Sequence, residues 1–509
     1  MWKSIEEYVF EHAADTPDKT ALITKEREVS YLRLADEVSS CAAFLRKKGV
    51  DRGSIVIVKS SQTIEYIVLN LGIHLAGGVV TALESTVSAD GIVQAAQAVG
   101  ADVVICDDLS VNERYSGQFL DSRELSFEGD NTGVWKADGG TILFRAGSDG
   151  FDFTFPGKAE PGNIYFTTGT TGASKGVEVS HGSLFAVTEN LIYGCSYPEE
   201  FVHLVPGPLN HANPIRNVAA SLVNGNACYI LNGMMNMRDF YGALEYPCER
   251  VSCCLPPPYV RILFMLSGDK IGEYADKIDF IVSSTAPFPE PDKERLCRLL
   301  PSSRLYNSYG SSESGVVCMY SYQEHPGLAG CVGRETRNSQ VLIVDDERKE
   351  IASSAGHPGL IACRGPINMT GYVNEPELTA QYFQDGTFYT NDIGYKDENG
   401  FVYILGRKGD VINVGGLKVA PAEVEEAALT YEGLEDCICV GVEDRITGKA
   451  LKLLVVLREG MALDKRDLRQ YLSSRLELYK VPQFYEQVDQ IKRTFNGKLD
   501  RKAYRQELM

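Results

Sequence analysis

Apolar residues recur at alternating helical and strand spacings through the first hundred positions of the chain. Over 31–47 they follow the three- and four-residue spacing of a helix, and the run 54–58 is apolar enough for a buried strand. A second helix is predicted over 64–76, with strands at 79–80 and 103–105. Strands that alternate with helices in this way are typical of an α/β fold with a largely parallel sheet.

The same pattern returns after residue 200. Short apolar runs at 202–205, 251–255 and 280–282 are each followed by Pro or Ser. Polar positions at the ends of buried strands are where open α/β sheets bind ligands. The segment 107–160 in between is rich in Gly, Ser and Asp and has no sustained period, so we expect an irregular, solvated surface segment there.

The pattern changes character after residue 340. Apolar runs at 341–344, 360–363 and 401–405 are separated by turns and predict a smaller β-rich subdomain. Beyond a polar, glycine-flanked joint, the chain combines helical patterns at 422–430 and 465–476 with strand patterns at 438–442 and 451–457. We therefore expect an N-terminal domain over 1–406, a hinge at 407–409, and a small α+β C-terminal domain over 410–509.

Composition narrows the class of partners. The chain has 509 residues, too many for a single core, and a net charge of −19 with no long basic run. Nucleic acid and anionic membranes are therefore disfavoured as partners. The charged N-terminus lacks the apolar centre of a signal peptide, and no uncharged apolar run is long enough to span a bilayer, so we expect a cytoplasmic protein.

The thirteen cysteines are scattered along the chain. They form no CxxC pair and no Cys/His cluster with the spacing of a zinc site. We therefore expect buried, reduced thiols rather than disulfides or a metal centre.

Residues 167–176 form a segment of hydroxyls and glycines between two apolar runs, 163–166 and 177–179. The segment holds four threonines, Ser174, Lys175 and three glycines. The glycines let the backbone approach a ligand, and the hydroxyls and the lysine can hold a polyphosphate. The spacing differs from that of the P-loop, because Ser174 precedes Lys175 and a glycine follows it. We predict a phosphate-binding strand–loop–strand unit; a surface turn is the alternative.

Six local patterns follow one another in a fixed order: TTGTTGASKG at 167–176, PLNH at 208–211, YGSSE at 309–313, DIGY at 392–395, GR at 406–407 with GG at 415–416, and NGK at 496–498. In this order and spacing the chain resembles the adenylate-forming superfamily of acyl-CoA synthetases, carrier-protein adenylation domains and luciferases. The resemblance extends from about residue 31 to residue 501, and it is most specific over 365–379 and 386–407.

The resemblance implies a fold and a two-step reaction. The fold is α/β: a large N-terminal domain of two α/β sheets plus a smaller β-rich subdomain, followed by a small mobile α+β C-terminal domain. A carboxylate attacks the α-phosphate of ATP to give an acyl-adenylate and pyrophosphate. The C-terminal domain then rotates, and the thiol of coenzyme A displaces AMP to form a thioester. ATP, Mg²⁺ and coenzyme A are therefore expected.

The resemblance also implies roles for individual residues in nucleotide binding. The β- and γ-phosphates would be held by Thr167, Thr168, Gly169, Thr170, Thr171, Gly172 and Lys175. Tyr309 would stack on adenine, Asn307 would bond its amino edge, and Gly310 would lie beside them. Asp392 would accept both ribose hydroxyls, with Arg407 also reaching the ribose. A helix-cap or turn role is the alternative for Asp392.

The remaining implied roles concern the chemistry and the domain movement. Glu313 would hold Mg²⁺ and the Ser312 hydroxyl would face the α-phosphate, although Glu313 taken alone could be a solvated acid. Lys498 would bridge the substrate carboxylate and the α-phosphate. His211 would close the acyl pocket, with a structural histidine as the alternative. Gly409 would serve as the hinge, and Gly415 and Gly416 would line the path of the thiol.

Two departures from the family bear on the acid. Ser308 stands where the family usually has glycine at the pocket floor, which argues against long fatty acids and for a short, medium or aromatic acid. Residues 210–216 are polar, so Asn213 or Arg216 could bind a polar group or second carboxylate; an ion pair of Arg216 with a structural acid is the alternative. Ser284 and Thr285 complete the expected pocket.

Several readings compete with a CoA ligase. The nearest transfers the acyl group to the phosphopantetheine of an acyl carrier protein. Activation of an amino acid is disfavoured, because no Asp stands in 208–216 for the substrate amine. A luciferase-like oxygenase or an inactive nucleotide-binding protein is more remote, since the chain keeps Lys175, Glu313, Asp392 and Lys498. The sequence leaves the oligomeric state open between monomer and homodimer.

Overall fold

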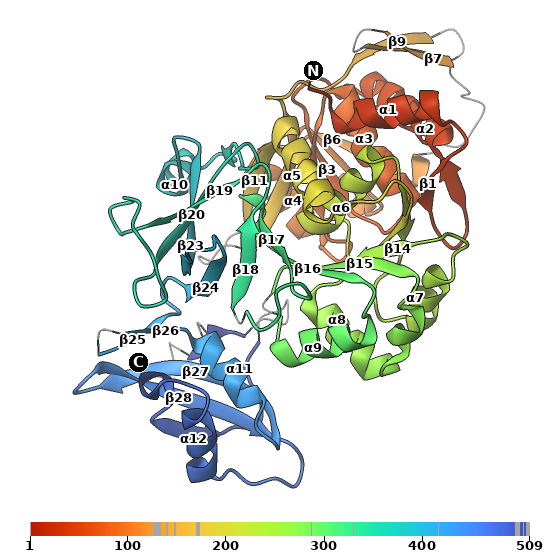
Figure 1. Cartoon of the computed structure of the whole chain (residues 1–509). Helices are drawn as coiled ribbons and strands as arrows, with labels where there is room; N and C mark the ends of the chain where they lie inside the picture. The colour runs from red at the N-terminus through yellow and green to blue at the C-terminus, as the bar shows by residue number, and fades with distance from the viewer. Residues whose placement is uncertain are drawn as a thin grey trace.

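The structure is a computed structural model, and it describes residues 2–125, 134–138, 141–146, 149–168, 174–286, 288–328, 330–415, 417–493, 499–501 and 503–504. Figure 1 shows a large N-terminal part built on two sheets and a smaller C-terminal part, in blue, set beside it. The predicted fold class, α/β with a large N-terminal and a small C-terminal domain, is confirmed. No helix in the described part of the chain is both long and apolar enough to cross a membrane.

The first sheet has seven strands and contains most of the elements predicted near the N-terminus. Its order is β21-β11-β10-β4-β3-β5-β6, with the strands from β10 to β6 parallel. The strands are β3 (Ile55–Lys59), β4 (Val79–Leu83), β5 (Val103–Cys106), β6 (Gln118–Asp121), β10 (Pro161–Thr168), β11 (Ser174–Ser180) and β21 (Gly371–Tyr372). The connecting helices are α2 (Tyr31–Lys47), α3 (Ile64–Ala76) and α4 (Ala89–Val99), so the predicted alternation over 31–105 is confirmed.

Local signals explain where α3 begins and ends. The Thr63 hydroxyl accepts a hydrogen bond from the amide of Tyr66 and so caps the first turn. The helix ends at Gly77, whose φ of 93° suits glycine in the left-handed region. A side chain at this position would also meet Arg52 Cα at 3.0 Å.

The second sheet has fourteen strands and carries the predicted ligand-binding strand ends. Its order is β19-β20-β23-β24-β18-β17-β16-β15-β14-β12-β13-β1-β2, with β22 paired to β23. One half is β1 (Thr20–Ile23), β2 (Glu28–Ser30), β12 (Val202–Val205), β13 (Ala227–Ile230), β14 (Val251–Cys254), β15 (Ile278–Ser283) and β16 (Arg304–Ser311). From β13 to β16 its neighbouring strands are parallel.

The other half of this sheet is the predicted β-rich subdomain. It consists of β17 (Gly315–Ser321), β18 (Cys331–Glu335), β19 (Gln340–Val344), β20 (Gly359–Arg364), β22 (Phe383–Gln384), β23 (Thr387–Lys396) and β24 (Val402–Arg407). All these pairings are antiparallel, and β16 pairs with β17. The subdomain therefore continues the large sheet rather than forming a sheet of its own.

Helices between the two sheets form the main core. The largest apolar cluster joins residues of both sheets to α1 (Ile5–Asp15), α2, α3 and α6 (Ala212–Val223). A second cluster packs α7 (Met237–Leu244), α8 (Pro257–Ser267) and α9 (Glu290–Leu299) against the large sheet. The remaining N-terminal helices are α5 (His181–Gly194) and α10 (Pro376–Tyr382). Because these helices pack against both sheets, apolar residues are needed on more than one of their faces.

The expectation of an irregular segment over 107–160 is wrong. Besides β6, the segment contains an antiparallel sheet of β7 (Val134–Asp138), β8 (Thr141–Ala146) and β9 (Asp149–Thr154). Each strand is short and pairs with the next one along the chain. Strands this short end before the alternation can form a sustained period, which is why the pattern resembled a loop.

The C-terminal part has its own core. It contains β25 (Ile412–Val414), β26 (Leu417–Val419), α11 (Pro421–Leu429), β27 (Leu434–Asp444), β28 (Gly448–Leu457), α12 (Lys465–Ser473) and β29 (Phe484–Gln487). These elements agree with the predicted ones to within a few residues. Their apolar cluster consists entirely of residues from Ile412 onward.

Candidate functional site

The two strands that flank the predicted phosphate-binding residues are paired with each other. β10 and β11 run antiparallel, with Thr167 opposite Lys175 and Thr168 opposite Ser174. Ile164 and Val177 are buried and anchor the two strands in the sheet. The predicted residues Gly169, Thr170, Thr171 and Gly172 lie outside the described part of the chain. The two flanking strands are thus present, and the loop and its phosphate contacts stay a prediction.

Tyr372 connects this hairpin to Glu313. β21 pairs with β11, which places Tyr372 opposite Val177. The Tyr372 ring centroid lies 5.8 Å from Lys175 Nζ, and its hydroxyl donates a 3.1 Å hydrogen bond to Glu313 Oε1. Burial and the charge of Glu313 hold the pKa of Tyr372 far above its usual value, so the hydroxyl remains a donor. Sequence reasoning missed Tyr372, although it stands inside the quoted 365–379 motif.

The backbone around 309–315 forms a tight turn that positions Ser312 and Glu313. A Cβ on Gly310 would lie 1.7 Å from the carbonyl oxygen of Gly315, so only glycine fits. The Ser311 hydroxyl accepts 3.1 Å hydrogen bonds from the amides of Glu313 and Ser314. These contacts hold the turn, and with it Ser312 and Glu313, at the end of β16.

Three predicted nucleotide residues come together at the other side of the turn. Asp392 and Arg407 stand opposite each other on β23 and β24, with Asp392 Oδ1 3.3 Å from Arg407 Nε. The Tyr309 hydroxyl donates a 2.7 Å hydrogen bond to Asp392 Oδ2. Burial, reinforced by the charge of Asp392, raises the pKa of Tyr309 well above its usual value. Tyr309 therefore orients the carboxylate, a contact that the predicted stacking role did not include.

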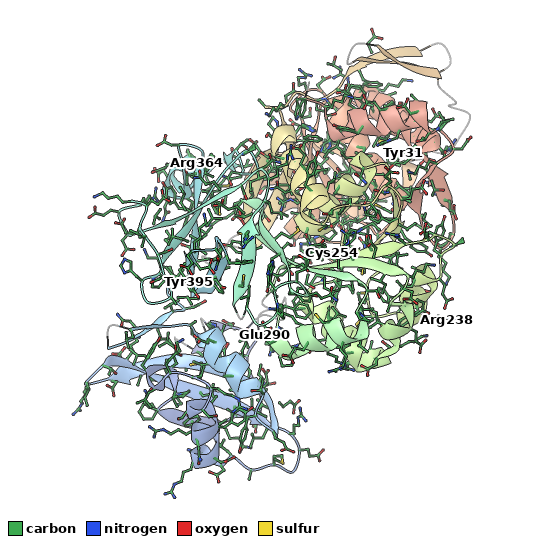
Figure 2. All side chains as sticks on the ribbon, in the orientation of Figure 1. Tyr31, Arg238, Cys254, Glu290, Arg364 and Tyr395 are labelled. Atoms are coloured by element: carbon green, nitrogen blue, oxygen red, sulfur yellow. The ribbon has the colours of Figure 1, made fainter. Side chains whose placement is uncertain are left out.

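Polar contacts connect residues that were predicted to line the acid pocket. The Asn213 amide, on α6, donates hydrogen bonds of 2.9 Å to Ser284 Oγ and 3.0 Å to Cys254 Sγ. Cys254 ends β14 in the middle of the N-terminal part, as Figure 2 shows. Ser308 is buried on β16, next to the buried Asn307. Sequence reasoning did not identify Cys254 among these residues, because a cysteine within an apolar run carries no signal of what it contacts.

Thr285 and His211 lie at more open positions. Thr285 follows Ser284 and has a φ of 72°, an uncommon value for a β-branched residue that marks a sharp turn at the end of β15. His211 precedes α6 and is about half exposed, with Nε2 3.9 Å from Glu84 Oε1. Glu84 was not predicted at the site. A half-exposed histidine beside an acid can serve as a movable cover at the pocket entrance.

Arg216 contacts the backbone of the 309–315 turn. Its guanidinium donates 3.1 Å hydrogen bonds to the carbonyl oxygens of Ser311 and Ser312. Among the described residues, no carboxylate lies within ion-pair distance of it, so the structural acid that was the alternative is absent there. α6 aims this residue at the back of the 309–315 turn, while Asn213 on the same helix faces the acid pocket.

Backbone hydrogen bonds to Arg407 hold the segment that was predicted to be the hinge, 407–409. The amides of Asp410 and Val411 donate to the Arg407 carbonyl at 2.8 and 3.1 Å, and Gly409 has a φ of 99° that suits glycine. Further on, the Gly415 amide donates to the Thr447 carbonyl at 3.0 Å. Gly416 and Lys498 lie outside the described residues, and their predicted roles stay predictions.

The C-terminal domain faces α9 and β23 of the N-terminal domain. Glu290 and Tyr395 lie on the side that faces it in Figure 2. Burial raises the pKa of Glu426, on α11, to about 7, with Lys293 opposing and Glu290 reinforcing the shift across the interface. The raised pKa of Glu426 indicates that this carboxyl is buried where the two domains meet and that no described cation there fully compensates its charge.

A buried trio near the N-terminus was not predicted. The carboxylate of Glu6, on α1, lies 2.8 Å from His74 Nδ1, and the His74 Nε2 lies 3.1 Å from the Gly162 carbonyl oxygen. The His181 ring packs against that of His74 with centroids 4.6 Å apart. Because these residues are far apart in the chain and flanked by ordinary helical patterns, the sequence held no signal that would join them.

Comparison with known proteins agrees with this geometry. The family model described as AMP-binding enzyme matches residues 9–373, and the model of the AMP-binding enzyme C-terminal domain matches residues 423–498. The chain is 26% identical to a long-chain-fatty-acid–CoA ligase of Bacillus subtilis (strain 168), over 99% of this chain and 94% of that protein. It is 25% identical to 4-coumarate–CoA ligase 2 of Oryza sativa subsp. japonica, over 99% and 92%.

A solved structure shows the shared fold. The crystal structure of ATP-bound MatB from Rhodopseudomonas palustris superposes with a TM-score of 0.84, at 21% sequence identity and over 99% of this chain and 98% of that one. The superposition includes both the large N-terminal part and the C-terminal domain, as the coverage of the two chains requires.

Proposed function

The chain belongs to the AMP-binding enzyme family, and from this premise we propose that it is an ATP-dependent acid–CoA ligase. The predicted family and the predicted enzyme class, an AMP-forming acid–thiol ligase, are confirmed by the family match and by relatives that are CoA ligases. In the first step a carboxylate oxygen attacks the α-phosphorus of ATP and pyrophosphate leaves. In the second, the CoA thiolate attacks the acyl carbonyl and AMP leaves.

The observation that carries the proposal is the convergence of two pairs of contacts on the 309–315 turn. On one side, Tyr372 links Lys175 to Glu313; on the other, Asp392 joins Tyr309 and Arg407. A nucleotide laid across the turn would meet a ribose-binding carboxylate at one end and a phosphate-binding cation at the other. Displacement at phosphorus depends on such positioning and on charge stabilisation.

Glu313 fits the expected magnesium ion. Only its Oε1 is engaged by a side chain, the Tyr372 hydroxyl, and carboxylate oxygens are the ligands that Mg²⁺ prefers. When bound with ATP, the ion would neutralise charge on the phosphates. The side chains of this protein then have three tasks: Asp392 binds the ribose, Lys175 holds the phosphates, and Ser312 presents a hydroxyl to the α-phosphate.

The acid we propose is short and polar, or aromatic, rather than a long aliphatic chain. Asn213, Ser284 and Cys254 form a connected polar wall, and the Ser308 side chain narrows the floor. An aliphatic chain can form no hydrogen bond with these polar groups, whereas a polar group on the acid can exchange hydrogen bonds with them. We base the polar character of the acid on Asn213 rather than on Arg216, because two guanidinium nitrogens of Arg216 already bond backbone carbonyls.

The second step requires the C-terminal domain to move. We propose domains at 1–406 and 410–509 with a hinge at 407–409, in which Gly409 absorbs the backbone rotation. Lys498 would act in the adenylation arrangement, and Gly415 and Gly416 would line the thiol path in the other. Transfer to a carrier-protein phosphopantetheine would use the same movement and is the second candidate.

The decisive experiment measures ATP-dependent pyrophosphate release over a panel of short, medium-chain, long-chain and aromatic acids. Each acid is tested alone, with CoA, and with a phosphopantetheinylated carrier protein. We expect turnover with short polar or aromatic acids that rises when CoA is present. Turnover confined to long-chain acids would contradict the proposed substrate class, and turnover only with carrier protein would favour the second candidate. Light emission with a luciferin would point to the oxygenase alternative.

A further inference from the structure

Arg216 places a positive charge inside the protein, directly behind the 309–315 turn. Arg216 is only 6% exposed and lies on the buried side of α6. Two guanidinium nitrogens bond two successive carbonyls, those of Ser311 and Ser312. The planar fork of arginine matches a pair of acceptors in a way that a flexible ammonium group does not. Arg216 therefore fixes both the position and the orientation of this backbone segment.

The charge of Arg216 lacks a counter-ion in the described part of the chain. Its other close contact is the Tyr165 ring, with the guanidinium carbon 5.5 Å from the ring centroid. Burial lowers the pKa of the guanidinium, and the nearby Tyr165 and the charge of Glu313 act against this shift. A buried charge without a partner is costly to maintain. Such a charge is more readily retained when an anionic ligand completes the site.

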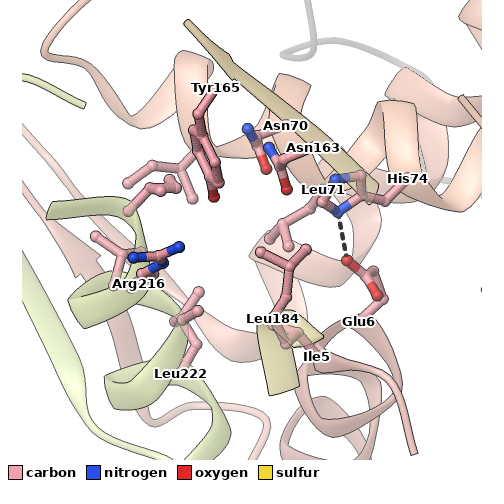
Figure 3. Close-up of a pocket in the computed structure, with 14 residues that line it drawn as sticks. Ile5, Glu6, Asn70, Leu71, His74, Asn163, Tyr165, Leu184, Arg216 and Leu222 are labelled. Atoms are coloured by element: carbon pink, nitrogen blue, oxygen red, sulfur yellow. Dashed lines mark hydrogen bonds and ion pairs between the residues drawn. The ribbon is translucent and has the colours of Figure 1, made fainter. Parts of the chain in front are cut away.

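On the side away from the 309–315 turn, the surroundings of Arg216 supply no group that neutralises its charge among the described residues. Figure 3 shows the guanidinium and the Tyr165 hydroxyl pointing into a cavity of about 30 Å³. Among the residues that the structure describes, neither Arg216 Nε nor the Tyr165 hydroxyl has a hydrogen-bond partner. The one acid that lines the cavity, Glu6, is bonded to His74 on its far side. A cavity of this size holds about two water molecules, which would screen Arg216 only weakly.

We propose that Arg216 is a positioning residue that also supplies fixed positive charge to the nucleotide site from behind the turn. Its fork holds the Ser311 and Ser312 carbonyls, and so sets where the Ser312 hydroxyl and the Glu313 carboxylate stand. Its charge attracts the polyphosphate of ATP from a buried position, where electrostatic interactions are stronger than in water. This inference rests on the proposed function for the identity of the anion.

The charge role differs measurably from a purely structural one. A structural role would change the binding of every ligand at the turn by a similar factor. Attraction by a buried cation instead grows with the negative charge of the ligand, because Coulomb energy scales with charge. Adenosine, AMP and Mg·ATP share the nucleoside and differ in phosphate charge, so they separate the two roles.

The experiment compares dissociation constants of adenosine, AMP and Mg·ATP, measured by calorimetry without acid or CoA. The variants are Arg216→Lys, which keeps the charge and loses the fork, and Arg216→Met and Arg216→Gln, which lose the charge. In the neutral variants we expect Mg·ATP affinity to fall about tenfold while adenosine affinity changes by about twofold or less. Arg216→Lys should keep the preference for Mg·ATP over adenosine, while its adenylation kcat falls because the turn is less well held.

A matched control is Arg304→Met. Arg304 lies on β16 and also donates to a backbone carbonyl, that of Cys195, but it is paired with Asp279 at 2.8 Å. Its removal should leave the ratio of Mg·ATP to adenosine affinity unchanged. Circular dichroism and a thermal scan report whether each variant is folded.

Three results would overturn the proposal. The first is an equal loss of adenosine and Mg·ATP affinity in the neutral variants, and the second is no loss of Mg·ATP affinity. The third is that neither neutral variant folds while Arg216→Lys does, which would assign the charge to the fold. A wild-type protein that binds ATP but activates no acid would contradict the proposed ligase activity and leave the Arg216 result standing.

Discussion

The phenol of Tyr309 donates a 2.7 Å hydrogen bond to Oδ2 of Asp392, although 83 positions separate the two residues in the chain. The other carboxylate oxygen lies 3.3 Å from Arg407 Nε. Asp392 is therefore oriented from two sides in the absence of a nucleotide. A carboxylate that is already aligned loses less freedom when it binds the ribose, which favours tight binding.

Replacing Tyr309 with phenylalanine tests this alignment. Tyr309→Phe keeps a ring that can stack on adenine and removes only the hydroxyl bonded to Asp392. Hydrogen bonds to charged groups contribute about 1.5–3 kcal/mol, so we expect KM for ATP to rise by about tenfold or more with a smaller change in kcat. Steady-state kinetics with the best acid measures this. Tyr193→Phe, an exposed phenol at the end of α5, is the matched control; an unchanged KM in Tyr309→Phe would speak against the alignment.

The ribose role of Asp392 is best tested by changing the ligand together with the protein. Wild-type protein should prefer ATP to 2′-deoxy-ATP, because Asp392 accepts the ribose hydroxyls. In Asp392→Asn we expect weaker ATP binding and a smaller preference for ATP over 2′-deoxy-ATP, because the lost acceptor is the one that bonds the ribose hydroxyl. Calorimetry of both ligands on both proteins completes the cycle. Additive losses, with the preference intact in Asp392→Asn, would refute the assignment.

Lys498 should act in the first step of the reaction and not in the second. Lys498→Ala removes the cation that brings the substrate carboxylate and the α-phosphate together, so we expect adenylation to fall by about a hundredfold or more. Thioester formation from preformed acyl-adenylate should stay within about threefold of wild type, because no phosphate displacement remains. Pyrophosphate exchange and thioester formation are measured separately. Lys465→Ala, at the start of α12, is the control, and equal losses in both steps would contradict the prediction.

The pair formed by Glu6 and His74 predicts a dependence of stability on pH. Burial raises the pKa of Glu6, but the hydrogen bond and charge of His74 outweigh it and lower the pKa to about 2. A lowered carboxyl pKa contributes stability above its usual value near 4.5 that is lost as pH falls toward 2. The contribution is on the order of 3 kcal/mol.

The variant Glu6→Gln isolates this contribution. We expect its urea unfolding midpoint to lie well below that of wild type at pH 7, with the difference shrinking between pH 4.5 and pH 2. Tryptophan fluorescence follows the transition, since one of the two tryptophans, Trp2, precedes α1. Glu7→Gln on the same helix serves as the comparison. A wild-type to Glu6→Gln difference that is the same at pH 7 and pH 3 would rule out the ion-pair explanation.

Much of the fold could be predicted because its signals are local. The helix 31–47 and the strand beginning at Ile55 follow from apolar spacing, and caps such as Thr63 and Gly77 mark helix ends. The sheet of β7, β8 and β9 could not be predicted in this way. Its short strands are stabilised by pairing with one another, and pairing leaves little trace in a single short segment.

The candidate site, like the fold, could be predicted only where its signals are local. The order of the motifs identified Lys175, Glu313, Asp392 and Arg407, because each motif combines residue types that suit one part of a nucleotide. The sequence could not show that Tyr372 links Lys175 to Glu313, since that contact depends on β21 pairing with β11. Nor could it show what Arg216 contacts.

By itself, then, the sequence determined the family and the reaction class and predicted which residues would approach ATP, because these depend on residue type and order. Only the tertiary structure decided the partners of those residues. Arg216 bonds the carbonyls of Ser311 and Ser312 rather than an acid, because α6 and the end of β16 are brought together by packing between the two sheets. Contacts between segments so far apart in the chain depend on the whole core, and no local pattern encodes them.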